Sequence, residues 1–344
     1  MELSVVIPIR DEAASLVELH REFTETLTKW GRPYELILVD DGSTDNSFDV
    51  MARLQAMDPR VRVIRFRRNF GQTAAFAAGF DFARGRLIAT SDGDLQNDPR
   101  DIPAMVEMID RGSDVVCGWR KDRQDAFLSR RLPSSIANGL ISFVTGVHLH
   151  DYGCSLKVFR AEIVKGLRLY GEMHRFLPAI ASEQTSSIVE MKVNHLPRRH
   201  GRSKYGIGRT GRVLLDLLTV KFLLSYSTRP LQFFGLIGGC IGLLGAMISG
   251  WLAYERLIGA ASLSNRPLLL LGILLIVTGV QLVTIGLVAE IQARTYHESQ
   301  SKPIYVIREI RQAVPGENVD NPDNVGNVDN RANVDRANRV GRAV

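Results

Sequence analysis

Two aspartates separated by one glycine, Asp92 and Asp94, are followed two residues later by Gln96. Their carboxylate and amide oxygens are hard ligands, and this spacing can direct them at one Mg²⁺ or Mn²⁺ ion that bridges a diphosphate. A single Asp-x-Asp is a weak signal, because carboxylates at such places often cap helices. A second acidic pair, Asp40 and Asp41, makes a metal-dependent phosphate site the better interpretation, although Asp41 is also a candidate cap.

Both acidic pairs follow apolar runs that predict β-strands. Five such runs alternate with helix-length segments; the runs are 3–7, 35–39, 61–66, 86–89 and 114–117, and the helical segments are 12–30, 44–56, 73–83 and 101–111. This alternation predicts a mostly parallel α/β sheet, in which ligands bind beyond the carboxyl ends of the strands. The acidic pairs come at the ends of the second and fourth runs, so we expect both at that edge.

Two later segments, 230–254 and 267–289, contain no charged residue. Each is long enough to cross a hydrocarbon core of about 30 Å, and only residues 255–266 join them, which favours a membrane hairpin over two buried helices of a soluble protein. Residues 198–229 hold eight Lys or Arg and one acid, whereas the joining loop holds two Arg. The positive-inside rule therefore predicts both flanks, and both termini, in the cytoplasm.

These features divide the chain into six parts. We expect a catalytic domain at 1–211, an amphipathic juxtamembrane helix at 212–229, the two spans, a return segment at 290–312 and an Asn-rich tail at 313–344. The tail has too few apolar residues to fold alone, so it is predicted to be disordered. The first span is rich in glycine, which permits helix association and leaves a homo-oligomer open.

Composition and motifs exclude several other functions. Apolar residues make up 45% of the 344 residues and charged residues 23%, as in folded proteins, and Lys plus Arg (43) exceed Asp plus Glu (37) by six. The three cysteines lack metal-binding spacing and are too few for a disulfide framework. No nucleic-acid module accompanies the basic residues. The GxGxxG at 206–211 follows a basic loop instead of a strand, so it does not predict a dinucleotide site.

Five motifs together resemble glycosyltransferase family 2, whose members have the GT-A fold, a Rossmann-like α/β domain. The motifs are Val5-Val6-Ile7-Pro8, Val39-Asp40-Asp41-Gly42-Ser43-Thr44-Asp45, Arg68-Asn69-Phe70-Gly71, Ser91-Asp92-Gly93-Asp94-Leu95-Gln96 and Asp151-Tyr152-Gly153-Cys154. Within the family the chain is similar to polyprenyl-phosphate glycosyltransferases from about Leu3 to Ile310. It departs from the usual pattern at Arg10-Asp11-Glu12, where Tyr-Asn-Glu is common, and at Gly93, where alanine is usual.

This resemblance implies an inverting transfer of one sugar from a nucleotide diphosphate-sugar to a polyprenyl phosphate, in particular undecaprenyl phosphate, at the inner (plasma) membrane. Such a reaction feeds cell-envelope glycan or lipid modification. The nucleotide-sugar site would hold Pro8, Arg10, Glu12, Asp40, Asp41 and Asp92, and the metal site Asp92, Asp94 and Gln96. Catalysis would depend on Asp92, Asp94 and Asp151, with the role of Asp151 left open.

A lipid monophosphate needs no strong general base, because its second pKa is about 6 and it is mostly dianionic near neutral pH. It needs cations that hold it in line with the anomeric carbon. The candidates are Arg120, Arg130, Arg131, Arg202 and Lys204, with Ser134 or Ser135 as a hydroxyl donor. An isolated Arg-Arg pair is more often solvated surface, but these residues flank the segment that is predicted to meet the membrane.

Three other functions remain as alternatives. A processive polysaccharide synthase would normally carry QxxRW and more spans. A family 2 glycosyltransferase with a non-polyprenyl acceptor is the second alternative; it could be membrane-associated, whereas an enzyme of the same fold with a soluble acceptor would not need the hairpin. A non-enzymatic membrane scaffold would not need acidic residues at strand ends. The sequence leaves the donor sugar and its nucleotide open.

Overall fold

The structure is a computed structural model that describes residues 1–121, 138–139, 141–142, 145–167, 169, 173–197, 230–258, 267–299 and 304–312. The chain forms two compact units, one made of Met1–Leu217 with Ser301–Val344 and the other of Leu218–Gln300. The predicted juxtamembrane helix at 212–229 and the predicted disordered tail at 313–344 lie outside the described residues.

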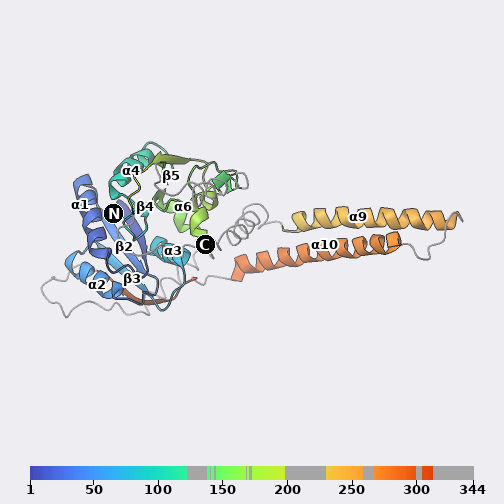
Figure 1. Cartoon of the computed structure of the whole chain (residues 1–344), viewed down its shortest axis with the longest axis horizontal. Coiled ribbons are helices and arrows are strands. Elements are labelled where there is room, and N and C mark those ends of the chain that lie inside the picture. The colour runs from blue at the N-terminus through green and yellow to red at the C-terminus, as the bar shows by residue number, and fades with distance from the viewer. Residues whose placement is uncertain are drawn as a thin grey trace. The chain divides into compact units, whose positions relative to one another are not determined.

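The first unit is built on an eight-stranded sheet with the order β7-β5-β6-β4-β1-β2-β3-β8. Strands β4, β1, β2 and β3 are parallel to one another, while β6 and β8 run antiparallel to their neighbours β4 and β3 (Figure 1). The strands are β1 (Leu3–Ile9), β2 (Tyr34–Asp40), β3 (Val61–Phe66), β4 (Leu87–Thr90), β5 (Val115–Trp119), β6 (Lys157–Arg160), β7 (Ile188–Lys192) and β8 (Ile307–Arg311). The predicted mostly parallel α/β architecture is confirmed.

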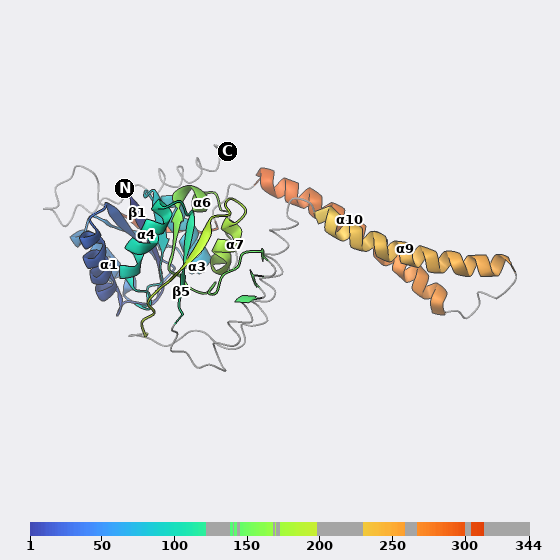
Figure 2. The ribbon, with the colours of Figure 1, turned by 90° about the horizontal axis from the view of Figure 1, so that it is seen from above.

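Helices cover both faces of this sheet. They are α1 (Leu16–Trp30), α2 (Ser47–Met57), α3 (Gln72–Phe82), α4 (Ile102–Asp110), α6 (Ala161–Lys165) and α7 (Leu177–Ala181), with 3₁₀ turns at Pro99–Asp101 and Met173–Phe176. Helices α1 and α4 pack on the face that carries Val5, whereas α3 packs on the opposite face, against Val6 (Figure 2). The sheet is therefore the middle layer of three.

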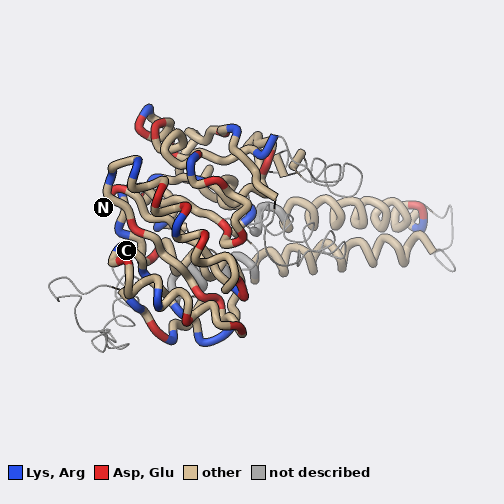
Figure 3. Tube along the Cα trace, turned by 60° about the vertical axis from the view of Figure 1, so that its left-hand side comes forward, with Lys and Arg blue, Asp and Glu red and all other residues tan. Residues whose placement is uncertain are grey.

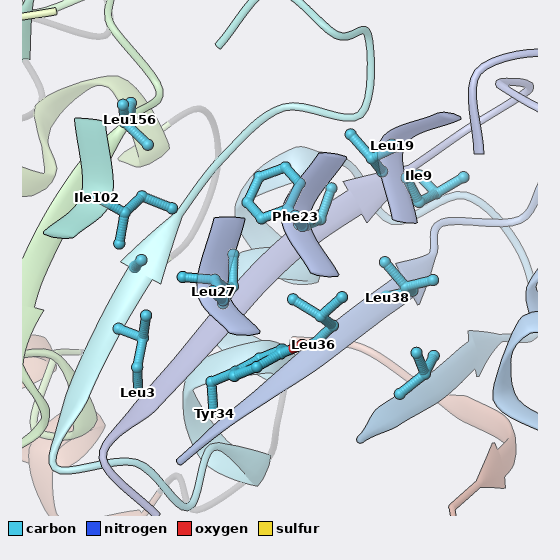
Figure 4. Packing of buried hydrophobic residues seen from close by; sticks show 14 of the residues in the cluster. Leu3, Ile9, Leu19, Phe23, Leu27, Tyr34, Leu36, Leu38, Ile102 and Leu156 are labelled. Atoms are coloured by element: carbon cyan, nitrogen blue, oxygen red, sulfur yellow. The ribbon is translucent and has the colours of Figure 1, made fainter. Parts of the chain in front are cut away.

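The core on the α1 side follows from the helical spacing of apolar residues. Leu16, Leu19, Phe23 and Leu27 recur every three or four residues, and all four are buried. Figure 4 shows Leu19, Phe23 and Leu27 packed over the strands of the sheet. Helix α1 ends at Gly31, whose φ of 78° is a left-handed conformation that glycine adopts without strain. This packing fixes the position of α1 on the sheet and hence the position of the loop that joins α1 to β1.

The segment that follows helix α10 (Pro267–Ser299) belongs to the first unit. Within the predicted return segment, 290–312, strand β8 forms at Ile307–Arg311 and pairs with β3. Just before it, the ring of Tyr305 stacks on Phe66 at 5.3 Å, and its hydroxyl donates to Asp81 at 2.7 Å. The return strand thus covers an edge of the sheet that would otherwise offer unpaired backbone groups.

The second unit contains two long helices, α9 (Pro230–Leu257) and α10 (Pro267–Ser299). They begin at the first residues of the two predicted spans and continue beyond their ends, and they lie side by side as a hairpin (Figure 1). Most side chains along both spans are exposed and apolar, and charge among the described side chains appears at the tip, at Glu255 and Arg256 (Figure 3). Helices buried in a soluble core would not show such surfaces.

Glycines on α9 and α10 face each other where the two helices contact. A Cβ atom on Gly279 would lie 2.6 Å from the carbonyl oxygen of Gly238 and 2.7 Å from the Cα of Gly242. At a second point of contact between the same two helices, a Cβ on Gly245 would lie 2.6 Å from the carbonyl oxygen of Gly272. These glycines therefore serve the contact inside the hairpin, because they let the two backbones approach closely.

Replacing Gly279 by Leu is expected to weaken the hairpin by about 1–3 kcal/mol, the usual cost of inserting a side chain into a packed interface. The obstructing atoms belong to the backbone of α9, so the helices have to separate. The measurement is the loss of helical circular dichroism of the full chain in mild detergent as SDS is added. Gly239→Leu is the matched control, because nothing lies within 4 Å of its Cβ position. Equal sensitivity of the two variants would contradict this packing.

Candidate active site

The loops after β1, β2 and β4 meet at the carboxyl edge of the sheet. In the strand register Ile9 lies opposite Asp40, and the N–H of Asp41 donates to the carbonyl of Ile9 at 2.9 Å. On the other side of β1, the N–H of Ser91 donates to the carbonyl of Val6 at 3.1 Å. The two acidic pairs, which are distant in sequence, therefore follow β2 and β4, the strands that flank β1 on its two sides.

The loops after β1 and β2 are joined by side-chain hydrogen bonds. The Asp11 carboxylate accepts from the N–H and the hydroxyl of Thr44 at 2.7 and 3.0 Å, and the N–H of Asp11 donates to the Ser43 hydroxyl at 3.1 Å. Asp11 has a φ of 53°, an unfavourable conformation for a residue with a side chain, and these bonds hold it there. The sequence shows Asp11 and Thr44 inside motifs but does not reveal that they bind each other.

Three predicted donor-site residues lie on or beside this joined pair of loops. Pro8 is half-buried on β1. Arg10 is exposed, with its Nε 4.0 Å from the Asp11 carboxylate. Glu12 is half-buried, and its N–H donates to the Ser47 hydroxyl at 3.0 Å. The predicted residues are thus gathered at one end of the sheet.

Asp40 is fully buried at the end of β2. Its Oδ1 accepts the N–H of Ser43 at 2.9 Å, and its Oδ2 lies 3.5 Å from the Nε of Arg65. Among the described residues this Oδ2 has no hydrogen-bond partner. Burial raises the pKa of Asp40 above its usual value, against the opposing effect of Ser43 and Arg65. A buried acceptor of this kind is a group to which a ligand N–H can donate.

Asp41 has a different role from its neighbour. Its carboxylate accepts the N–H of Phe70 at 2.7 Å, the side-chain amide of Asn69 at 2.6 Å and the N–H of Gly71 at 3.1 Å. Burial raises its pKa, although these bonds act in the opposite direction. Asp41 therefore holds the loop that leads into α3, and the structure places it beneath the predicted donor site as a support.

Asp92 and Asp94 follow β4 and are separated by a buried glycine. The side-chain amide of Gln72, the first residue of α3, donates to Asp92 at 2.7 Å. The carboxylate of Asp94 accepts the N–H of Gln96 at 3.2 Å, and Leu95 between them is buried with a φ of 60°. This tight turn keeps the predicted third ligand, Gln96, beside the two aspartates.

Burial, and after it the negative charge of Asp94, raises the pKa of Asp92 above its usual value. A hydrogen bond with Ser155 and the positive charges of Arg120 and Lys157 act in the opposite direction. This pair of carboxylates favours a bound cation, because a positive charge would offset the penalty that Asp94 places on the ionised form of Asp92. The site thus has the charge that a divalent metal would balance.

The donor set fits Mg²⁺ or Mn²⁺. No cluster of three or more His, Cys, Asp or Glu side chains occurs in the part of the chain that the structure describes. Two carboxylates and one amide oxygen are all hard ligands, and a cation held by so few protein groups keeps positions for a diphosphate and water. Asp92, Asp94 and Gln96 therefore suit a metal that is completed by its phosphate ligand.

The turn that carries the two aspartates is held from two directions. The hydroxyl of Ser15, which is buried, lies 2.9 Å from the carbonyl of Gly93. The N–H of Leu196 donates to the carbonyl of Gln96 at 3.0 Å, beside a bridge between Asn97 and His195. None of these supports was predicted, because each comes from a residue far away in the sequence.

A second group of charged residues lies directly after β5, on β6 and in the loop before β6. The Arg120 guanidinium binds Asp151 through two hydrogen bonds, Nε to Oδ2 at 2.8 Å and Nη2 to Oδ1 at 3.1 Å. Burial alone would lower the pKa of Arg120, but the bonds and charge of Asp151 outweigh it and raise that pKa. Lys157 is buried and donates to the carbonyl of Cys154.

Two members of this group were predicted and one was missed. Arg120 was predicted as a ligand for the acceptor phosphate and Asp151 as a catalytic residue, and the structure brings them into one ion pair. Lys157 was not predicted, although a lone charge in the apolar run Leu156–Phe159 is a signal that could have found it. The other predicted acceptor residues, Arg130, Arg131, Ser134, Ser135, Arg202 and Lys204, lie outside the described residues.

Comparison with known proteins gives a consistent result. Residues 4–168 match the family described as Glycosyl transferase family 2. The chain is 48% identical to dodecaprenyl-phosphate galacturonate synthase of Rhizobium johnstonii, over 90% of this chain and 93% of that protein. It is 38% identical to undecaprenyl-phosphate 4-deoxy-4-formamido-L-arabinose transferase of Pseudomonas aeruginosa, over 91% of each.

The fold is similar to a solved structure of a more distant protein. This is glucosyl-3-phosphoglycerate synthase from Mycobacterium tuberculosis, crystallised with Mn²⁺, UDP and phosphoglyceric acid. The TM-score is 0.52 at 18% sequence identity, and the match covers 64% of this chain and 78% of the other. At this identity the likeness shows the fold alone, and it agrees with the predicted GT-A architecture.

Proposed function

The chain belongs to glycosyltransferase family 2, and from this premise we propose that it transfers one sugar from a nucleotide diphosphate-sugar to a polyprenyl phosphate at the cytoplasmic face of a membrane. The observation that carries the proposal is the convergence of Asp40, Asp92 and Asp94 at the carboxyl edge of the sheet, in one chain with an apolar hairpin. The similarity to two polyprenyl-phosphate enzymes over nine-tenths of the chain supports the choice of acceptor.

In this proposal the donor lies across the ends of β1, β2 and β4. The buried Oδ2 of Asp40 accepts an N–H of the base, and the exposed guanidinium of Arg10 is near enough to the same loops to contact the nucleotide. Asp92, Asp94 and Gln96 hold the metal. When bound, the cation neutralises charge on the leaving diphosphate. Gln72 orients the Asp92 carboxylate by its hydrogen bond of 2.7 Å.

The acceptor phosphate attacks as a dianion, so no side chain has to remove a proton from it. The Arg120 guanidinium attracts this dianion, and its positive charge also acts on Asp92, one of the residues assigned to the metal. Arg130, Arg131, Arg202 and Lys204 remain candidates for the same phosphate. A single in-line displacement with these groups inverts the configuration at the anomeric carbon.

We also propose that α9 and α10 anchor the enzyme as a membrane hairpin with both flanks in the cytoplasm. Their exposed apolar surfaces and their lengths of 28 and 33 residues support insertion in a bilayer. The aromatic residues Trp251 and Tyr254 near the loop end of α9 are typical of a membrane–water interface. The basic residues on both flanks support the orientation.

The direct test is transfer by the purified full chain in detergent. Undecaprenyl phosphate, Mn²⁺ or Mg²⁺ and a panel of nucleotide sugars are supplied, with a UDP-uronic acid first because of the 48% identity to a galacturonate synthase. We expect one glycolipid, a phosphodiester whose mass equals that of undecaprenyl phosphate plus one glycosyl residue, formed only with metal and together with one nucleoside diphosphate. Products longer than one sugar, or transfer to soluble acceptors with none to the lipid, would contradict the proposal.

A further inference from the structure

Glu190 on β7 collects three donors that all belong to the loop before β6. Its Oε1 accepts the N–H of His150 at 2.8 Å and the N–H of Asp151 at 3.1 Å. Its Oε2 lies 2.7 Å from the Nδ1 of His150, whose ring stacks on Trp119 at 4.2 Å. One carboxylate therefore fixes the backbone of two consecutive residues.

The second of these residues is the one that holds Arg120. The Asp151 carboxylate binds the Nε and Nη2 of Arg120 and also accepts the N–H of Gly153 at 3.1 Å. A carboxylate that binds the side of a guanidinium through two bonds fixes the plane of that group as well as its place. In the described part of the chain, no further hydrogen bond of the Arg120 side chain is found beyond those to Asp151. As far as the described residues go, its remaining N–H groups can therefore donate to an anion.

We propose that Glu190 is a positioning residue for the acceptor phosphate, and that it acts by fixing Asp151 and thereby the guanidinium of Arg120. This inference rests on the proposed transfer to a lipid phosphate. It assigns Asp151 the task of orienting a cation, which agrees with a dianionic acceptor that needs no general base.

Placing the carboxylates of Glu190 and Asp151 close together has an electrostatic cost, which the orientation of Arg120 would explain. Glu190 is largely buried, with 11% of its side chain exposed, and it brings a second negative charge to the loop of Asp151, of which 3% is exposed. Two carboxylates in this setting repel each other, and the nearby cation Arg120 offsets that repulsion. A loop that needed only a fixed shape could be held by neutral hydrogen-bonding groups.

The test is Glu190→Gln in the full chain. Gln keeps the size of the side chain but loses the charge and one acceptor, so its hold on the two N–H groups and the His150 ring weakens. We expect the KM for undecaprenyl phosphate to rise by about 10-fold, as for other lost charge-assisted hydrogen bonds. The affinity for the nucleotide sugar, measured by calorimetry, should stay within about 2-fold of the wild type, and it also reports that the variant is folded.

Arg120→Lys provides the second half of the test. Lysine keeps the charge, but its ammonium group has no planar fork that the Asp151 carboxylate could fix through two parallel hydrogen bonds. If Glu190 acts through Arg120, then Glu190→Gln adds no further rise in KM in the Arg120→Lys background. Asp151→Asn should likewise add no further rise in KM in the Arg120→Lys background. This variant keeps the test available if Glu190→Gln does not fold. Rises that multiply in the double variants would overturn the proposal.

His150→Phe is the matched control. It retains an aromatic ring on Trp119 and both backbone N–H groups, but it removes the contact between the ring nitrogen and Glu190. We expect its KM for the lipid to change by less than about 3-fold, since the bonds that fix Asp151 remain. An effect as large as that of Glu190→Gln would contradict the proposal, because it would assign the loss to the loop before β6 as a whole.

A wild-type enzyme that glycosylates no polyprenyl phosphate would overturn the proposed function itself. An active wild type together with an unchanged KM in Glu190→Gln would overturn only this inference.

Discussion

Replacing Asp94 by Asn is expected to lower the rate of sugar transfer by about 100-fold or more, in line with the loss of other groups that stabilise a developing charge. Asp94 follows the buried turn after β4 and is one of two carboxylates that suit the metal. The substitution keeps the size of the side chain and an oxygen that can accept the N–H of Gln96. The loss should therefore come from weaker metal binding, which is measured directly by Mn²⁺ titration in the presence of UDP.

Asp49→Asn is the control for this variant, because Asp49 is exposed in the first turn of α2 and is not one of the residues that suit the metal. It removes the same charge from the same unit and should leave both transfer and Mn²⁺ binding near the wild-type values. Thermal unfolding should be similar for the two variants. An Asp94→Asn enzyme that turns over at a near-normal rate in saturating Mn²⁺ would show that this aspartate is not a metal ligand.

Much of this site could be predicted because it depends on local rules. Apolar runs marked the strands, and the parallel arrangement placed the residues that follow them at one edge. Asp40 and Asp92 were therefore brought together correctly although about fifty positions separate them. The motifs around these residues indicated the kind of chemistry, and the similarity to a solved GT-A structure confirms the architecture that the motifs implied.

The supports of the site could not be predicted, because they depend on contacts between distant residues. Gln72 reaches Asp92 only when α3 lies on the correct face of the sheet, and Glu190 reaches Asp151 only when β7 pairs with β5. Neither residue stands out by type or spacing. Asp41 shows the converse: its motif suggests a ligand or a helix cap, yet its carboxylate is occupied by the loop before α3.

A buried ion pair lies at the opposite end of the sheet from the site. Glu35 on β2 and Arg62 on β3 are each about 5% exposed, and their side chains approach to 3.1 Å. Glu35 also accepts the Ser4 hydroxyl at 2.6 Å and the N–H of Arg84 at 2.7 Å. Arg62 also donates to the carbonyl of Phe82, and its Nε has no partner among the described residues. Glu35 is therefore the better satisfied of the two.

This asymmetry predicts that the two single substitutions differ. Burial lowers the pKa of Arg62, and the charge of Glu35 is the main influence against that shift. Glu35→Gln leaves a buried guanidinium without its counter-charge and is expected to cost about 3–5 kcal/mol in the free energy of unfolding. Arg62→Met should cost less, because the remaining carboxylate keeps the Ser4 and Arg84 donors. Urea unfolding of the full chain in detergent, followed by circular dichroism, measures both.

The double variant separates charge from packing. In Glu35→Gln with Arg62→Met, the glutamine oxygen still accepts from Ser4 and Arg84, and no uncompensated charge is left inside. Replacing a whole buried pair is often nearly neutral, whereas breaking it is not. We therefore expect the double variant to be clearly more stable than Glu35→Gln alone, with donor binding unchanged because the pair is far from the strand ends that form the site. A double variant as unstable as Glu35→Gln would mean that these residues stabilise the sheet by shape and hydrogen bonding, and that their charges contribute little.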